Sequence, residues 1–425
     1  MNPQQRIPKL RFPEFEQDGK WEEKTLGRIL QSISNGLSIE QCKDKSGYRV
    51  TRIETISNKA IDLEKVGYVV TDQDISEYKL AVGDILLSNI NSLSHIGKAV
   101  YVDKEYNLYH GMNLLRLIVD SSNSSSFVFY QIDSDRVKKS IERRANKSVN
   151  QASINQTDLK KITLFIPPSL KEQQKIASCL SSADEVIGAH VRKLALLQAH
   201  KKGLMQQLFP QAGAKTPRLR FPEFQQDGAW EEKTLGEVAE FVNEKTPLEE
   251  ISIDSYISTE NLLPDYTGIT AALKLPTSGS FTKYREGDVL VSNIRPYLKK
   301  VWFSDKEGAS SNDVFVVRSK SDIQSLFLSF LLKNDNFINY VMVGAKGVKM
   351  PRGDKSLIKR YPILFPSLSE QQKIADCLSS LDRLMAAMNK KITLLQQHKK
   401  GLMQQLFPPA LKGRHTIGMG KTHAP

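Results

Sequence analysis

Apolar residues recur at alternating steps of four and three in two separate stretches of the chain, which is the spacing of a heptad seam on a long helix. Both stretches depart from this spacing at the same point, where Lys201 and Lys399 occupy seam positions. The pattern predicts helices over 169–210 and 367–408. The residues expected to form the helix-pairing seam are Ile176, Leu180, Ile187, Leu194, Leu197, Ile374, Leu378, Leu381, Met385, Ile392 and Leu395.

The residues around each stretch indicate where the helices begin and end. Ser169 is followed three residues later by Glu172, and this pair is typical of a capping box at a helix start. A long helix with one apolar seam needs a partner, and the matching seam of the other stretch is the simplest one. The two helices are therefore expected to pair antiparallel, with two ordinary core helices in separate domains as the alternative. Prolines, which cannot continue a helix, bracket the two stretches at Pro168, Pro210, Pro366 and Pro408.

The chain also repeats itself over long distances. The segment Pro-Lys-Leu-Arg-Phe-Pro-Glu-Phe at 8–15 recurs with one substitution at 217–224. The segment His-Lys-Lys-Gly-Leu-Met-Gln-Gln-Leu-Phe-Pro at 200–210 recurs unchanged at 398–408. Between these blocks the identity falls sharply. Each half is thus a near-identical frame around a divergent insert, which predicts a molecule with a pseudo-two-fold internal repeat.

Both inserts read as mixed α/β domains of one fold. Short runs rich in β-branched and aromatic residues, separated by turn signals, predict strands, and a helical stretch follows at about 126–142 and again at about 323–340. The clearest match between the inserts is Gly-Asp-Ile-Leu-Leu-Ser-Asn-Ile at 83–90 with Gly-Asp-Val-Leu-Val-Ser-Asn-Ile at 287–294. The expected fold class is α/β: two similar globular domains at 1–168 and 211–366, separated by a pair of long antiparallel coiled-coil helices at 169–210 and 367–408, with a flexible tail at 409–425.

The excess of basic over acidic residues indicates what kind of partner the chain binds. Lysine and arginine number 60 against 47 acidic residues, so the formal net charge is +13, which favours a polyanion such as DNA or RNA. The N-terminal residues lack the apolar core of a secretory signal, and no run of about 18 apolar residues predicts a membrane span. Three scattered cysteines without a CxxC pair favour reduced thiols in a cytoplasmic protein.

Basic and amide side chains gather near the ends of the predicted elements, at equivalent positions in the two inserts. Arginine and lysine bind phosphates or guanine edges, and asparagine and glutamine pair with adenine. For any single residue, a solvated surface charge is the alternative. The candidate DNA-binding residues are Arg143, Arg144, Lys147, Asn150, Gln151, Arg295, Lys299, Lys300, Lys349, Arg352 and Lys355.

The sequence contains no recognisable set of catalytic or metal-binding residues. It lacks the GxxxxGK[ST] phosphate-binding loop and the Asn/Asp-Pro-Pro-aromatic motif of adenine methyltransferases. Its seven histidines do not form the pairs that hold a metal ion. Two copies of a frame without such motifs indicate binding in preference to catalysis.

Several segments of the frame, each present twice, carry a family resemblance: Leu-Arg-Phe-Pro-Glu-Phe, Trp-Glu-Glu-Lys-Thr-Leu-Gly, the Gly-Asp patch of the inserts, and the Lys-Lys-Gly-Leu-Met-Gln-Gln-Leu-Phe end. The most specific is the helix start Glu-Gln-Gln-Lys-Ile. Over residues 7–408 the chain resembles the specificity subunits of type I restriction–modification enzymes. The resemblance implies that each insert is a target recognition domain that reads one half of a bipartite DNA site. It also implies that the paired helices set the length of the spacer between the half-sites.

The resemblance further implies partner subunits. Two methyltransferase (modification) subunits would dock on the frame, and restriction subunits with translocase and nuclease activity would join them. The chain itself would bind double-stranded DNA, would bind no cofactor and no membrane, and would catalyse nothing. S-adenosylmethionine, ATP and Mg²⁺ are then expected on the partner subunits. The main rival is a coiled-coil scaffold or adaptor without sequence-specific DNA binding; a fused methyltransferase is disfavoured because no cofactor motif is present.

Overall fold

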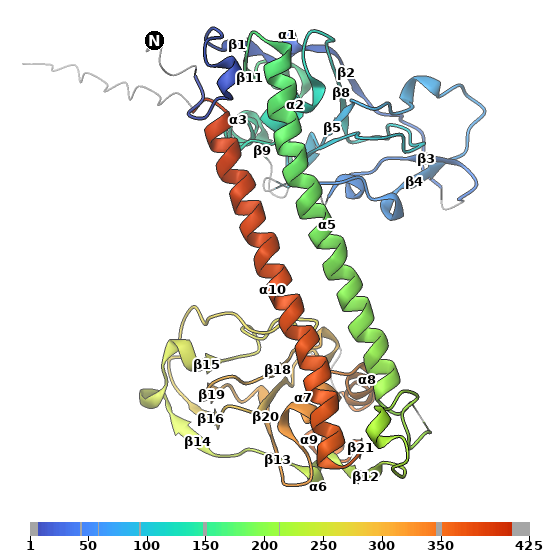
Figure 1. The fold of residues 1–425 in the computed structure, drawn as a ribbon, viewed down its shortest axis with the longest axis vertical. Coiled ribbons are helices and arrows are strands. Elements are labelled where there is room, and N and C mark those ends of the chain that lie inside the picture. The colour runs from blue at the N-terminus through green and yellow to red at the C-terminus, as the bar shows by residue number, and fades with distance from the viewer. Residues whose placement is uncertain are drawn as a thin grey trace, which may run out of the picture. The chain divides into compact units, whose positions relative to one another are not determined.

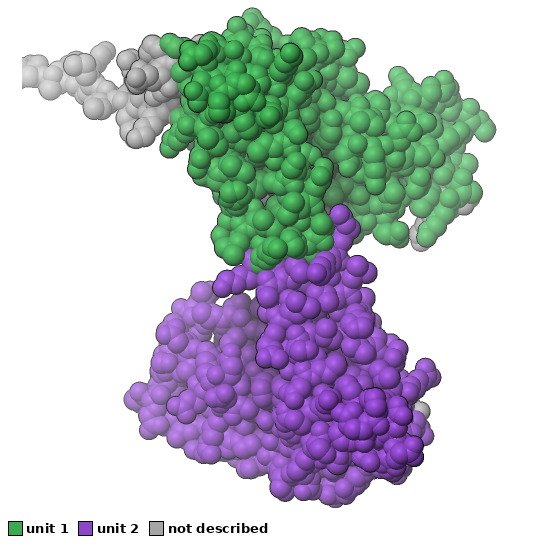
Figure 2. Space-filling model, viewed as in Figure 1, with its two compact units in different colours: residues 1–191, 391–425 green, residues 192–390 purple. Residues whose placement is uncertain are grey.

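A computed structural model describes residues 7–42, 45–57, 59–92, 95–147, 151–211, 213–345 and 351–409. The chain divides into two compact units, coloured separately in Figure 2. Unit 1 comprises residues 1–191 and 391–425, and unit 2 comprises residues 192–390. Each unit therefore contains one insert, the beginning of one long helix and the end of the other, whereas the sequence boundaries placed the helices in segments of their own. Of the expected tail, residues 410–425 lie outside the described residues.

Unit 1 is built on a four-stranded antiparallel sheet with the strand order β2-β8-β5-β7 (Figure 1). Smaller sheets join β1 with β11, β3 with β4, and β6 with β10 and β9. The strands are β1 (Glu22–Thr25), β2 (Leu30–Asn35), β3 (Tyr48–Val50), β4 (Gly67–Val69), β5 (Ile85–Leu87), β6 (Ile90–Asn91), β7 (Ala99–Tyr101), β8 (Leu115–Val119), β9 (Asn146–Lys147), β10 (Ala152–Ser153) and β11 (Thr163–Ile166). The helices are α1 (Leu26–Ile29), α2 (Ser125–Ile132), α3 (Asp135–Arg144), α4 (Gln156–Lys160) and α5 (Leu170–Leu208), which ends in unit 2.

Unit 2 repeats this sheet with the order β13-β20-β17-β18, and β12 pairs with β21 as β1 pairs with β11. A second four-stranded sheet has the order β14-β16-β19-β15. The strands are β12 (Glu231–Thr234), β13 (Ala239–Phe241), β14 (Lys245–Pro247), β15 (Tyr256–Ile257), β16 (Ser280–Tyr284), β17 (Val289–Ser292), β18 (Val301–Phe303), β19 (Gly308–Ser310), β20 (Val314–Ser319) and β21 (Pro362–Phe365). The helices are α6 (Leu235–Val238), α7 (Ser325–Leu332), α8 (Asp335–Val343), α9 (Lys355–Lys359) and α10 (Leu368–Leu406), which ends in unit 1. The two mixed α/β units confirm the expected fold class.

Each core is completed by the end of a helix that begins in the other unit. In unit 1 the Phe127 ring lies 5.7 Å from Trp21 and 5.8 Å from Phe407, which follows α10. In unit 2, Phe209 takes the same position, 5.5 Å from the Phe327 ring. The unchanged Leu-Phe-Pro end of the repeat is thereby explained, because in both copies it anchors a helix end in an aromatic core.

The two long helices pair antiparallel within each unit. In unit 1, the beginning of α5 shares a core with residues at the end of α10, and further along Asp184 lies 2.6 Å from Lys399 Nζ. In unit 2, Lys201 Nζ lies 2.6 Å from Asp382 in the same way. The two lysines that interrupt the heptad spacing therefore form ion pairs across the helix pair.

The expected seam residues are all buried or half-buried in the helices. Ile176, Leu180, Ile374, Leu378 and Ile392 are buried, and the other six are half-buried. By contrast, Leu196, one position outside the seam, is 71% exposed.

The helix start Glu-Gln-Gln-Lys binds the duplicated N-terminal segment of its own unit. Ser169 Oγ accepts a hydrogen bond from Glu172 N at 3.4 Å, as a capping residue does. The Glu172 carboxylate, however, does not complete a capping box: it is fully buried and accepts two hydrogen bonds from Arg11, at 2.8 and 2.7 Å. Arg220 and Glu370 form the same bidentate pair in unit 2. The capping-box prediction is wrong because a buried arginine offers the carboxylate a stronger partner.

The next residues of the helix start also have defined contacts. Gln173 Oε1 accepts a hydrogen bond from Ser124 N at the entrance to α2, and Lys175 Nζ lies 3.3 Å from Glu14. Gln371 and Lys373 repeat these contacts with Gln324 and Glu223. The duplicated motif is thus a set of frame contacts within each unit. None of the helices within the described residues is long and apolar enough to cross a membrane.

Candidate nucleic-acid interface

In both units, the Asn-Ile end of the duplicated Gly-Asp patch pairs with a second backbone segment that is distant in the sequence. In unit 1, β6 pairs with β10, and Ile154 N donates to Asn89 O at 2.9 Å. In unit 2, Gly353 N donates to Asn293 O at 3.2 Å, and Ile294 forms a β-bridge with Arg352. The patch therefore joins two distant segments of each insert into one surface.

The Gly-Asp dipeptide that opens the patch makes the turn into the central strand. Gly83 and Gly287 have φ angles of 101° and 86°, a region that favours glycine. Asp84 accepts a hydrogen bond from Ala81 N and forms an ion pair with Arg116 at 2.8 Å. In unit 2, Asp288 accepts a hydrogen bond from Arg285 N and forms an ion pair with Arg318 at 2.7 Å. This local structure explains why the patch is retained in inserts that otherwise diverge.

In unit 1 the predicted basic residues follow one another along the chain into this surface. Arg143 and Arg144 are exposed in the last turn of α3, and Lys147 is exposed on β9, whose partner is β10. Arg144 Nη1 donates to Ser140 Oγ at 2.7 Å, which orients an otherwise exposed guanidinium. Gln151 is exposed beside β10, and Asn150 lies outside the described residues.

In unit 2 the fold brings two predicted arginines together. Arg295 N donates to Pro351 O at 2.9 Å, so Arg295 and Arg352 lie on paired backbone segments. Arg352 is oriented by Asp313, 3.2 Å away, and its side chain is still 56% exposed. An exposed guanidinium held by one carboxylate can offer its remaining donors to a base edge or a phosphate. Lys349 lies outside the described residues.

Backbone strain is concentrated at this place in unit 2. Arg295 and Lys299, on either side of a single 3-10 turn, have φ angles of 51° and 54°. Asp265 and Tyr266 also have positive φ, and their amides bond to the backbone of this turn. Such conformations cost on the order of 1–3 kcal/mol for each residue and tend to cluster at binding sites.

Two predicted lysines of unit 2 have partners within the fold. Lys299 Nζ lies 2.7 Å from the Asp335 carboxylate, and Lys300 Nζ donates to Thr259 O at 2.6 Å. Burial, and then the nearby charge of Arg295, lower the pKa of Lys300 below its ordinary value. These contacts give both lysines a role in holding the loop.

The sequence reasoning named Lys355 as a candidate but missed its neighbour Lys245. Lys245 lies on β14, and it lines a small hollow together with Lys355, the first residue of α9. Lys359, one turn further along α9, lies over the Phe241 ring, with 5.6 Å between Nζ and the ring centroid. Lys245 is a single lysine in a divergent insert, so no pattern in the sequence marks it.

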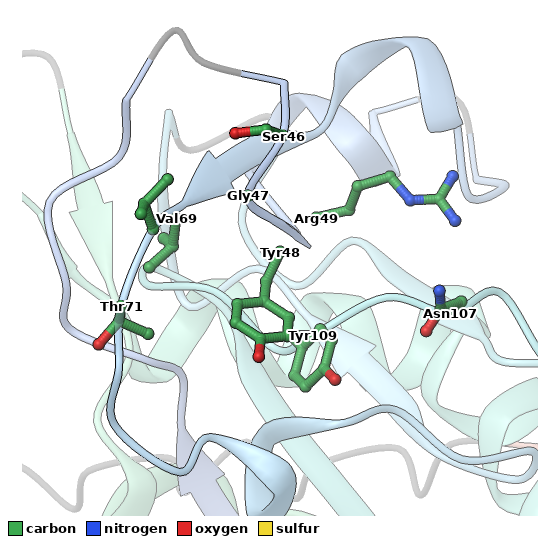
Figure 3. A pocket seen from close by; sticks show the side chains of 9 residues that line it. Ser46, Gly47, Tyr48, Arg49, Val69, Thr71, Asn107 and Tyr109 are labelled. Atoms are coloured by element: carbon green, nitrogen blue, oxygen red, sulfur yellow. The ribbon is translucent and has the colours of Figure 1, made fainter.

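A hollow of about 460 Å³ in unit 1 was also missed (Figure 3). The Tyr48 and Tyr109 rings lie side by side in it, with their centroids 5.2 Å apart, and Tyr48 is 43% exposed. Arg49, Thr71 and Asn107 add polar groups to its lining. Exposed aromatic rings next to arginine can stack on nucleobases. The sequence showed this segment only as a β-strand.

Comparisons with known proteins show the family to which the chain belongs. The family model described as "Type I restriction modification DNA specificity domain" matches residues 18–199 and 228–397. The putative type I restriction enzyme MjaX specificity subunit of Methanocaldococcus jannaschii is 33% identical over 410 residues, which cover 91% of this chain and 92% of that protein. The EcoDI specificity subunit of Escherichia coli is 24% identical over 196 residues, 44% of this chain and 42% of that protein.

Solved structures share the fold. The crystal structure of the S subunit of a type I restriction-modification system from M. genitalium has a TM-score of 0.60 at 18% identity, and the match covers 95% of this chain and 100% of that one. A chain from a structure described for assembly and conformational transition of a type I system has a TM-score of 0.50 at 16% identity, covering 91% and 97%. With two matched specificity domains and a relative aligned over nearly its whole length, the chain belongs to the family of type I restriction–modification specificity subunits.

Proposed function

We propose that this chain selects the DNA sites at which its partner subunits act, and that each unit reads one half of a bipartite site. One observation carries this proposal. The shared frame of both units positions the same pair of backbone segments, and the exposed cations there differ: in unit 1, Lys147 lies on β9, which pairs with β10, whereas in unit 2 Arg295 and Arg352 lie on the paired segments themselves. A constant scaffold with different reading groups would recognise two different half-sites.

Within each unit, the exposed arginines are the proposed readers of base edges. Arg144 in unit 1 and Arg352 in unit 2 each have a partner that orients the guanidinium and leave donors unused. An oriented arginine can form a bidentate pair with guanine in the major groove. No contact among the described residues orients Lys147 or Arg143, and both side chains suit the less directional contacts to phosphate.

The long helices are proposed to set the spacer between half-sites and to dock two methyltransferase subunits. Large apolar side chains lie exposed at corresponding positions of the two helices: Val186 and Leu384 are 47% and 44% exposed, and Leu196 and Leu394 are 71% and 55% exposed. Exposed apolar side chains that recur by symmetry favour two equivalent protein partners.

In this proposal the chain itself catalyses no reaction. Methylation and cleavage would take place on methyltransferase and restriction subunits, which would carry S-adenosylmethionine, ATP and Mg²⁺. This assignment leaves the chain's own residues three tasks: to orient the duplex, to select its sequence and to hold the partners at a fixed spacing.

The experiment that tests the proposal is single-molecule methylome sequencing. Cells would express this chain together with its neighbouring methyltransferase, and control cells would express the methyltransferase alone. A bipartite methyladenine motif that appears only with this chain is the expected result. Methylation of the same motif in both cultures would contradict the proposal, as would the absence of DNA binding by a complex whose methyltransferase binds S-adenosylmethionine.

A further inference from the structure

Two lysines that are far apart in the sequence of unit 2 line one hollow of about 90 Å³. Lys245 comes from β14, and Lys355 opens α9. Asn243, Thr282 and Asn312 supply the other polar groups of the lining, and no acidic residue is part of it. The hollow is therefore polar and positively charged.

Neither ammonium is neutralised within its surroundings. Lys245 Nζ donates to Asn312 Oδ1 at 2.6 Å and to Thr282 Oγ1 at 3.0 Å, and Lys355 Nζ donates to Asn243 Oδ1 at 3.2 Å. All three acceptors are uncharged, and no ion pair joins either lysine to a carboxylate in the described part of the chain. Because an ammonium has three donors, Lys245 retains one and Lys355 retains two.

A third lysine, Lys359, lies beside the hollow. Lys355 and Lys359 lie over the same Phe241 ring, with Nζ 5.7 and 5.6 Å from its centroid. Burial, and then the charges of Lys359 and Lys245, lower the pKa of Lys355. Glu244, the acidic residue next to Lys245, forms ion pairs with Lys283 and Arg285. Bringing like charges together is unfavourable unless an anion joins them.

We infer that this hollow binds a phosphate group of the DNA backbone, through the ammonium groups of Lys245 and Lys355. The inference rests on the proposed function and adds to it a contact that fixes the position of the duplex. The hollow adjoins the proposed base reader, because Asn312 precedes Asp313, which holds Arg352. Phosphate contacts set the register in which an arginine meets its base.

Within the described residues, unit 1 has no counterpart of Lys355 at the start of its short helix. The short helices α4 and α9 begin at equivalent places, after the capping residues Asn155 and Asp354. Where α9 begins with Lys355, α4 begins with Gln156, which has no charge. The proposed phosphate contact at this place is therefore specific to unit 2 among the described residues.

The test measures the salt dependence of DNA binding. The full chain with its methyltransferase is titrated against a 40-base-pair duplex at several KCl concentrations. For K245Q and K355Q, the slope of log Kd against log[KCl] is expected to fall by about 0.9 each, the value for one lost phosphate contact. K283Q is the control, because it also removes one positive charge, from the adjacent strand. Lys283 is paired with Glu244, so this variant should leave the slope unchanged.

A slope unchanged in K245Q and K355Q, in a wild-type complex that binds the duplex, would overturn the site and leave the proposed function intact. Absence of duplex binding by the wild-type complex would overturn both the phosphate site and the proposed function.

Lysine acetylation of the unaltered protein gives a second readout that needs no variant. Lys245 and Lys355 should be protected by the duplex but not by 10 mM inorganic phosphate; protection by phosphate alone would assign the site to a free anion and overturn the backbone contact.

Discussion

At the scale of single residues, a buried bidentate ion pair joins the beginning of each long helix to the N-terminal segment of its unit. Glu172 and Glu370 are 0% and 1% exposed at their side chains, and Arg11 and Arg220 are 7% and 11% exposed. In unit 1 the Trp21 indole also donates to Glu172, at 3.2 Å. Removing one partner of such a pair leaves a charge buried without compensation, so each pair controls the stability of its own unit.

Replacing Arg11 by alanine is expected to destabilise unit 1 by about 3–5 kcal/mol, because the Glu172 carboxylate stays buried. Hydrogen exchange of the amides around Trp21 measures this locally. R220A is the matched variant and should act around Trp230 instead. K24A removes one partner of an exposed pair with Glu22 and should change the free energy of opening by less than about 1 kcal/mol. An R11A effect as small as that of K24A would contradict the prediction.

His110 makes the stability of unit 1 depend on pH. It is 1% exposed, its Nε2 lies 3.0 Å from Leu114 O, and burial lowers its pKa from 6.5 to about 4. The unfolded chain therefore binds the proton more readily, so stability is full above about pH 6.5 and declines as the pH falls towards 4. The loss should reach about 3 kcal/mol, at 1.36 kcal/mol for each pKa unit.

Urea unfolding between pH 7.5 and 4 checks this prediction when wild type and H110Q are compared. Both proteins share the contribution of the carboxylates, so their difference isolates His110. The wild type should lose more stability than H110Q over this interval. Parallel pH profiles would show that His110 does not account for the change.

At the scale of elements, the long helices are the part that the sequence described best. The heptad spacing and the flanking prolines predicted 169–210 and 367–408, and the helices are Leu170–Leu208 and Leu368–Leu406. The single helical stretch expected at 126–142 is instead two helices, α2 and α3. The break is at Ser134, whose Oγ accepts a hydrogen bond from Val137 N and caps the second helix. Apolar periodicity alone did not show it, because both helices contribute to one core.

The two proposed base readers, Arg144 and Arg352, lead to a prediction of half-site specificity. R144A and R352A should each weaken binding by about 1–3 kcal/mol, and each should relax the sequence requirement at one half-site only. Competition binding with duplexes mutated in one half-site at a time measures this. K139A, which removes a neighbouring charge on α3, serves as the control for net charge. Equal losses on all duplexes would assign the two arginines to phosphate contacts.

At the scale of the whole molecule, unit 1 consists of two separate segments of the chain, and unit 2 is the segment between them. Each long helix begins in one unit and ends in the core of the other, where Phe407 and Phe209 occupy equivalent places. The frame repeats so closely because the same contacts are needed twice. Cutting the chain between the halves would therefore deprive both cores of a helix end.

Shortening both helices by one heptad tests their role as a spacer. Deleting residues 187–193 and 385–391 keeps the heptad phase and shortens each helix by about 10 Å, which corresponds to about three base pairs of DNA. The spacer of the methylated motif should shorten by about that number, with both half-sites unchanged. Methylome sequencing measures it. An unchanged spacer in an active complex would contradict the role of the helices as a ruler.

By itself, the sequence determined the α/β class, the internal repeat, the antiparallel helix pair and the family. These properties depend on periodicity and on long identical segments, which are visible without any structure. Only the tertiary structure decided that Arg11 is the partner of Glu172, that the backbone segments of Arg295 and Arg352 pair, and that Lys245 and Lys355 share a hollow. The reason is physical: such contacts join residues that are far apart in the chain, inside inserts that share little sequence, and their positions depend on how the strands pair.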